Sequence, residues 1–272
     1  MADHADTLMD RIGRRLAHRL EAPTPGYAPY THANVAALRR VLEPGDVLLV
    51  EGYSRISVAI KYLTMSTWSH SAMYVGNSLG RVSAEGEPLT LVEVNLGQGC
   101  VAVPLSKYER FNTRICRAAS LSIEDRARVV DFMLRGIGKR YDMKNILDLM
   151  RYFLPTPPVP PRWRRRMLAM GSGDPTRAIC SSLIAEAFEH VRYPVLPRIT
   201  PGFRADAGAR RQRREILEIR HHSLYAPRDF DLSPYFRIVK PTLAGGFDHR
   251  ALVWREPQGA PDAIRRMRPW FH

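Results

Sequence analysis

The segment Arg177-Ala-Ile-Cys180-Ser-Ser-Leu-Ile-Ala-Glu-Ala-Phe188 places a cysteine in the first turn of an expected helix. Its apolar side chains recur at helical spacing, at Leu183, Ile184, Ala187, Phe188 and Val191. A helix N-terminus gathers unpaired N–H groups and the positive end of the helix dipole, and both stabilise a thiolate. A cysteine at this position can become a nucleophile near neutral pH, although free cysteines there are more often small packed residues. The segment therefore raises the question of whether the chain also supplies a base.

The bulk composition is that of a globular protein with a strongly basic balance. The chain has 272 residues, 45% hydrophobic and 25% charged, which suits one large domain or a domain with extensions. Its 41 Lys+Arg against 27 Asp+Glu give a formal net charge of +14. Such a field attracts polyanions, either nucleic acid or anionic membrane headgroups. A solvated arginine-rich surface explains the same balance, so both interpretations stay open.

The cysteine count bears on the redox compartment. The three cysteines Cys100, Cys116 and Cys180 are an odd number without repeated spacing, which argues against a disulfide framework. No pattern of metal ligands is present, and we expect neither a metal nor a cofactor. The N-terminus lacks an export signal, and no apolar run of membrane-spanning length occurs. We therefore expect a cytoplasmic protein, with peripheral membrane contact as an extension of that prediction.

Periodicity and turn residues predict an α+β fold with an antiparallel sheet. The expected strands are 47–50, 69–76, 90–95, 100–103, 115–117 and 236–240. The expected helices are 34–41, 54–65 (mostly buried), 122–137, 145–153 and the Cys180 helix, with 204–220 partly helical and 226–235 a loop. Gly97-Gln-Gly99 makes a tight connection, so the strands on either side of it should be antiparallel.

Cysteine hydrolysis needs an imidazole to share the thiol proton and a polar group to orient that imidazole. His70 is the candidate base, because it lies in an apolar strand with Trp68 and Tyr74 nearby. Glu93 lies in the following strand between two valines, where a carboxylate is unfavourable unless it is paired. If the two strands are neighbours, Glu93 can accept the His70 ring N–H. A satisfied core histidine and an outward-facing glutamate on an edge strand are the alternatives.

These residues resemble a known family. The segments Gly45-Asp46-Val-Leu-Leu, Trp68-Ser-His70-x-x-x-Tyr74-Val-Gly76, Val92-Glu93, Cys180-Ser-Ser-x-x-x-x-x-Phe188 and Pro227-Arg-Asp-Phe-Asp-Leu-Ser-Pro-Tyr235 carry the likeness. They are similar to the circularly permuted NlpC/P60 cysteine hydrolases of the YiiX/YebB type, which are related to lecithin:retinol acyltransferase-like proteins. The resemblance implies a permuted papain-like fold in which the antiparallel sheet packs against helices that include the nucleophile helix. It further implies Cys180 as nucleophile, His70 as general base and then acid, and Glu93 as the orienting group.

The resemblance covers about residues 43–240 and suggests a division of the chain. We expect residues 1–42 to form a basic amphipathic helix and a linker, and 43–240 to form the catalytic domain. A Pro/Arg-rich insertion near 155–177 interrupts that domain, and 241–272 forms a tail. The N-terminal helix can pack on its own domain or lie on a membrane surface.

The resulting hypothesis is a cysteine hydrolase or acyltransferase that cleaves an amide or ester through a thioester acyl-enzyme. The expected partner is a small lipid-like or peptide amide or ester substrate. The predicted cytoplasmic location favours lipid-like or acyl-amide substrates over cell-wall peptides, which the superfamily also cleaves. A non-enzymatic binder of nucleic acid or anionic membranes is the rival, although no specific nucleic-acid motif is present. A degenerate scaffold without turnover, and the oligomeric state, stay open.

Overall fold

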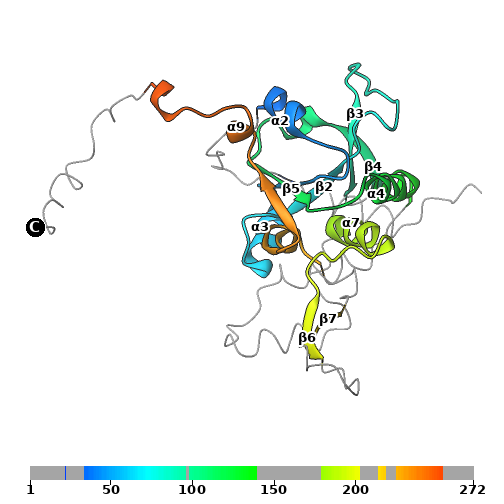
Figure 1. The fold of residues 1–272 in the computed structure, drawn as a ribbon. Helices are drawn as coiled ribbons and strands as arrows, with labels where there is room; N and C mark the ends of the chain where they lie inside the picture. The colour runs from blue at the N-terminus through cyan, green and yellow to red at the C-terminus, as the bar shows by residue number, and fades with distance from the viewer. Residues whose placement is uncertain are drawn as a thin grey trace, which may run out of the picture.

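A six-stranded antiparallel sheet forms the centre of the protein in the computed structural model, which describes residues 22, 34–95, 98–139, 179–202, 214–218 and 225–253 (Figure 1). Its order is β4-β3-β2-β1-β5-β8, and every neighbouring pair is antiparallel. The strands are β1 (Val47–Val50), β2 (His70–Tyr74), β3 (Leu89–Asn95), β4 (Gly99–Pro104), β5 (Thr113–Ala118) and β8 (Phe236–Val239). The α+β class and the predicted antiparallel pairing are confirmed.

The helices flank this sheet and lie close to the predicted positions. They are α2 (Val35–Val41), α3 (Arg55–Thr64), η1 (Leu105–Tyr108), α4 (Ile123–Gly136), α7 (Ile179–His190), α8 (Pro227–Leu232), α9 (Pro241–Ala244) and η3 (His249–Ala251). Side chains of Asn34, Ser54 and Ser122 cap α2, α3 and α4 by accepting from the backbone three residues on. Because capping residues can be recognised in the sequence, the predicted first residues of these three helices agree with the structure.

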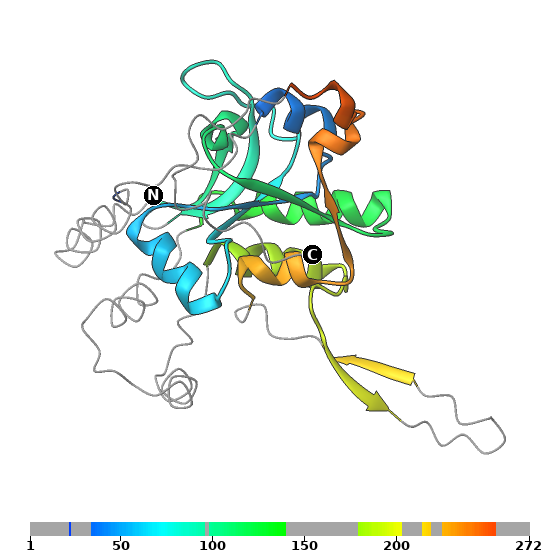
Figure 2. The same ribbon diagram turned by 90° about the vertical axis from the view of Figure 1, so that its left-hand side faces the viewer.

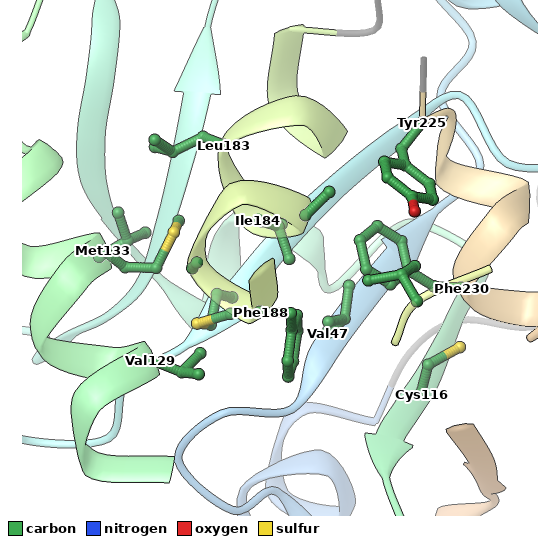
Figure 3. Packing of buried hydrophobic residues seen from close by; sticks show 14 of the residues in the cluster. Val47, Cys116, Val129, Met133, Leu183, Ile184, Phe188, Tyr225 and Phe230 are labelled. Carbon is green, nitrogen blue, oxygen red and sulfur yellow. The ribbon is translucent and has the colours of Figure 1, made fainter. Parts of the chain in front are cut away.

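Two hydrophobic cores lie on opposite faces of the sheet, because alternate residues of β1 and β2 point to opposite sides. The first core contains Val47, Met73 and the buried face of α7, with α4 packed beside it. Figure 3 shows Ile184 and Phe188 of α7 among residues of β1, α4 and α8. The second core contains apolar residues of α2 and η1 together with the other face of β1 and β2. Both faces of the central strands are therefore covered.

A buried ion pair fixes the start of β1. Asp46 is 1% exposed, and its carboxylate accepts from Nε and Nη2 of Arg117 on β5, both at 2.7 Å. Burial raises the pKa of Asp46, although hydrogen bonds from Arg117 and from the Glu43 backbone lower it. The preceding Gly45 has φ +90°, a conformation that favours glycine. The Gly45-Asp46 segment is thus a structural corner that anchors the central strand.

The predicted partial helix at 204–220 is wrong at its C-terminal end, because Arg214–Glu218 is a strand. This strand, β7, pairs antiparallel with β6 (Arg198–Gly202). The two form a hairpin that projects from the body of the molecule (Figure 2). The backbone hydrogen bonds of β7 are made with β6, which is distant in the sequence. Local periodicity does not predict such pairing.

Two other local expectations are also corrected. Residues 226–235 were expected to form a loop, yet α8 begins there, with Pro227 in its first turn and the Asp229 carboxylate accepting from the Ala226 N–H at 3.0 Å. Proline and aspartate are common in turns, but they also favour helix N-termini. The helix α3 was expected to be mostly buried, whereas Val58 is 45% and Tyr62 65% exposed. Only one face of α3 packs against the rest of the protein.

The predicted segments outside the core fall largely beyond the described residues. The N-terminal helix, the 145–153 helix and the 155–177 insertion lie outside the described part of the chain. Residues after β8 continue into α9, which lies beside α2, and then into η3. The division at 1–42, 43–240 and 241–272 stays a prediction. Within the described residues, no helix has the length and apolar character needed to span a bilayer.

Replacing Phe188 by alanine should destabilise the protein strongly. Phe188 is fully buried and contacts the rings of Phe230, Phe236 and Tyr193. We expect the free energy of unfolding to fall by about 3–5 kcal/mol in denaturant titrations. The matched control is Phe247→Ala, because Phe247 is 48% exposed. Equal losses for the two variants would contradict the assignment of Phe188 to the core.

Candidate active site

Cys180 is the second residue of α7, as the sequence predicts. Its side chain is buried, with the whole residue 6% exposed. Because it lies in the first helical turn, its backbone N–H has no partner four residues earlier within the helix. The helix packs on β2 and β3, which brings the sulfur to the strands that carry the other two predicted residues.

His70 is the first residue of β2, where Val50 of β1 is its partner. The segment just before it is held at two points. The Trp68 indole Nε1 donates to the Asp231 carboxylate of α8 at 2.9 Å, and the Ser69 hydroxyl accepts from the Gly52 N–H at 2.9 Å. The imidazole itself is 21% exposed. The strand therefore presents a fixed ring that solvent still reaches.

Glu93 lies on β3, beside β2, with Ala72 as its cross-strand partner. Residues two apart share a face of a strand, so Glu93 and His70 are diagonal neighbours on one face. His70 Nε2 lies 3.2 Å from Glu93 Oε2, and the Glu93 side chain is fully buried. The outward-facing alternative for Glu93 is therefore wrong. An ionised carboxylate only accepts, so Nε2 carries the proton and Nδ1 is left for the sulfur.

The titration behaviour links the imidazole to the sulfur. Burial raises the pKa of Cys180, but the charge and hydrogen bond of His70 overcome this and lower it to about 7. Burial lowers the pKa of His70, yet the Cys180 thiolate and the Glu93 carboxylate raise it to about 10. The two shifts describe one coupled pair. Between these values the thiolate–imidazolium form is favoured, and a thiolate is the nucleophilic form of a cysteine.

Two buried serines lie near the Cys180 sulfur. The Ser71 hydroxyl on β2 lies 3.2 Å from the Ser181 hydroxyl, and Ser181 Oγ lies 3.9 Å from Cys180 Sγ. Both serines are fully buried. Hydrogen bonds from Ser71, side chain and backbone, add to the lowering of the Cys180 pKa. Ser181 follows Cys180 on α7 and Ser71 belongs to β2, so both elements place a hydroxyl near the sulfur.

The sequence missed two further partners of Glu93. Lys107 Nζ donates to Glu93 Oε1, and the Tyr108 hydroxyl donates to Oε2, the atom that also faces His70. Burial raises the pKa of Glu93, but the imidazolium and the Lys107 ammonium lower it to about 2. A buried carboxylate signals that donors must exist. It does not say which residues supply them, and η1 reaches Glu93 only because it folds back over the sheet.

A pocket of about 650 Å³ lies on the side of the sheet where α3 and α8 meet β1 and β5. Its wall includes Trp68 and four charged side chains, Glu51, Arg114, Arg228 and Asp231. Arg114 makes two hydrogen bonds to Asp231 at 2.7 and 2.8 Å and lies 5.0 Å from the Trp68 ring. Among the described residues, no group of three or more His, Cys, Asp or Glu side chains is placed to hold a metal ion.

A comparison with protein-family models finds one family for part of the chain. Residues 41–153 match the family model described as permuted papain-like amidase enzyme, YaeF/YiiX, C92 family. The matched residues include His70 and Glu93, whereas Cys180 lies beyond them. No curated protein matches the chain.

The match supports the permuted papain-like family and indicates a thiol hydrolase enzyme. It supports the papain-like, permuted and YiiX-like parts of the resemblance. The relationship to NlpC/P60 and to lecithin:retinol acyltransferase-like proteins stays a prediction. The amidase description also bears out cysteine-dependent amide hydrolysis in general.

Cys180 should react with iodoacetamide faster than the other two cysteines. Burial raises the pKa of Cys100 to about 11 and raises that of Cys116 as well, whereas that of Cys180 is lowered to about 7. At pH 7 the larger thiolate fraction, partly offset by lower intrinsic nucleophilicity, should make Cys180 about 50-fold faster than Cys100. Peptide mass spectrometry after timed labelling measures the rates. Uniform slow labelling would rule out an activated thiolate.

Proposed function

We propose that the protein is a cysteine amidase with Cys180 as nucleophile, His70 as general base and acid, and Glu93 as the orienting carboxylate. The observation that carries the proposal is the 3.2 Å approach of the His70 imidazole to the buried Glu93 carboxylate, together with the electrostatic coupling of that imidazole to the Cys180 sulfur. The three residues come from α7, β2 and β3, so tertiary packing alone brings them together. The family match supports the reaction class.

The reaction follows from these positions. The Cys180 thiolate attacks the amide carbonyl carbon, and the oxyanion that forms accepts from the Cys180 backbone N–H. His70 gives its proton to the departing nitrogen, so the C–N bond breaks, an amine leaves and a thioester remains. His70 then takes a proton from water, and the resulting hydroxide attacks the thioester. The C–S bond then breaks, a carboxylic acid is released, and the sulfur leaves as a thiolate beside the imidazolium, which restores the starting ion pair.

The substrate belongs to one of two amide classes. Lipid-like or acyl-amide substrates are the expectation from the sequence, and the basic composition would suit an anionic membrane surface. Peptide amides are the other class, because the family model that matches residues 41–153 is described as a permuted papain-like amidase. Acyl transfer to an acceptor other than water uses the same thioester. We propose in addition that the protein is cytoplasmic and contacts membranes peripherally.

Substituting the nucleophile or the base should abolish turnover. We expect Cys180→Ala and His70→Ala to lower kcat by at least about 10⁴-fold, because each removes a member of one chemical unit. Glu93→Gln should cost less, since nucleophile and base remain. The assay follows amine release from a panel of peptide amides, N-acyl amides and esters, with circular dichroism as the folding control. Unchanged activity in the first two variants would refute the enzyme proposal, and the preferred panel member identifies the substrate class.

The activity should follow a bell-shaped pH profile. Activity requires the thiolate, which forms as pH rises through about 7, and the imidazolium, which is lost as pH rises through about 10. The profile of kcat/KM for the best substrate should therefore rise on its acid limb and fall on its alkaline limb near these values. A profile with a single limb rising above pH 8 would indicate an ordinary thiol instead of a thiolate–imidazolium pair.

A further inference from the structure

The buried carboxylate of the site is contacted from a second element, η1, which follows β4 directly. Lys107 Nζ and Tyr108 Oη each donate to a different oxygen of Glu93. The Tyr108 side chain is buried in the second core, and its ring lies 6.1 Å from the His70 ring. Lys107 keeps 37% of its side chain exposed. The carboxylate thus has an imidazole on one side and an ammonium on the other.

We propose that Lys107 and Tyr108 are positioning residues of this site, Lys107 by balancing its charge and Tyr108 by fixing the orientation of Glu93. The proposal rests on the function proposed above. The four ionised groups alternate in sign, from the Cys180 thiolate through the His70 imidazolium and the Glu93 carboxylate to the Lys107 ammonium. Their net charge is zero. Removing the ammonium leaves a net charge of −1 in a poorly solvated place.

The loss of the Lys107 ammonium shifts the neighbouring pKa values in one direction. A group of net charge −1 takes up protons more readily, so every neighbouring pKa rises when Lys107 is neutralised. Both the thiolate and the imidazolium midpoints should therefore move to higher pH. The other titratable group that faces Glu93 is Tyr108, whose pKa burial and Glu93 raise. Cys100 on β4 lies on the other face of the sheet, and burial raises the pKa of its thiol to about 11. Neither can replace the lost positive charge.

Tyr108 acts differently, because its hydroxyl is neutral and its replacement by phenylalanine changes no charge. It shares Oε2 of Glu93 with His70 Nε2 and so holds that oxygen in line with the imidazole. Tyr108→Phe keeps the ring that packs against Phe111 with centroids 5.6 Å apart. It should lower kcat about tenfold and leave KM unchanged, because orientation of the base affects the chemical step and not substrate binding.

The deciding experiment measures the rate of Cys180 alkylation by iodoacetamide between pH 5 and 11 in the full chain. We expect Lys107→Met and Lys107→Gln to raise the thiolate midpoint by about one pH unit, since one nearby charge is lost. Lys107→Arg should restore the wild-type midpoint. The matched control is Arg128→Met, which removes one cation from the exposed pair with Asp125 on α4 and should leave the midpoint unchanged. Thermal unfolding confirms that each variant is folded.

The outcomes distinguish the roles proposed for Lys107 and Tyr108 from the function on which they rest. A wild-type midpoint near 9, the ordinary value of a thiol, would overturn the nucleophile assignment and this inference with it. A wild-type midpoint near 7 that Lys107→Met and Lys107→Gln leave unmoved would overturn the charge-balancing role alone. A wild-type kcat in Tyr108→Phe would overturn the orienting role alone. A shift in the two Lys107 variants that Lys107→Arg reverses supports the proposal.

Discussion

The site depends on an ionised carboxylate held without contact to water. Transfer of a carboxylate into the interior costs several kcal/mol unless hydrogen bonds and opposite charges replace its solvation. Glu93 is fully buried and receives donors from His70, Lys107 and Tyr108. Glu93 can therefore stay ionised only because η1 packs against the sheet and supplies two of these donors. The negative charge of Glu93 in turn stabilises the His70 imidazolium. Loss of one donor would leave part of that desolvation cost uncompensated.

The same constraint explains why the sulfur is acidic although it is buried. A buried thiol ordinarily has a raised pKa, as Cys100 and Cys116 show. Cys180 differs because it faces an imidazolium, which is itself stabilised by Glu93. The three cysteines share a low exposure, so exposure alone does not distinguish them. Cys180 is distinguished by the neighbouring His70 imidazolium, whose positive charge is stabilised by the Glu93 carboxylate.

The sequence predicted the parts of this arrangement that local patterns encode. The apolar run of β1, the alternation in β2 and the periodic face of α7 specified their elements, and the unfavourable position of Glu93 pointed to a partner on the next strand. The strand β7 was missed because its hydrogen bonds come from β6, and α8 was missed because proline and aspartate suit both loops and helix starts. Lys107 and Tyr108 carry no local signal at all. They contact Glu93 only because η1 folds back over β3, and this is a feature of the tertiary structure.

Register ties the fold to the chemistry. In the observed pairing Ala72 is opposite Glu93, so Glu93 shares a face with His70 and is covered by η1. A shift of one residue in β3 would turn every side chain of that strand to the other face. Val92 or Val94 would then stand next to the imidazole, while the carboxylate would enter the apolar core under α7, where Met73 and Ile184 lie. Such a shift would both bury valine against a polar group and leave a charge among apolar side chains. The energy that selects the strand pairing is thus the same energy that places the carboxylate behind the base.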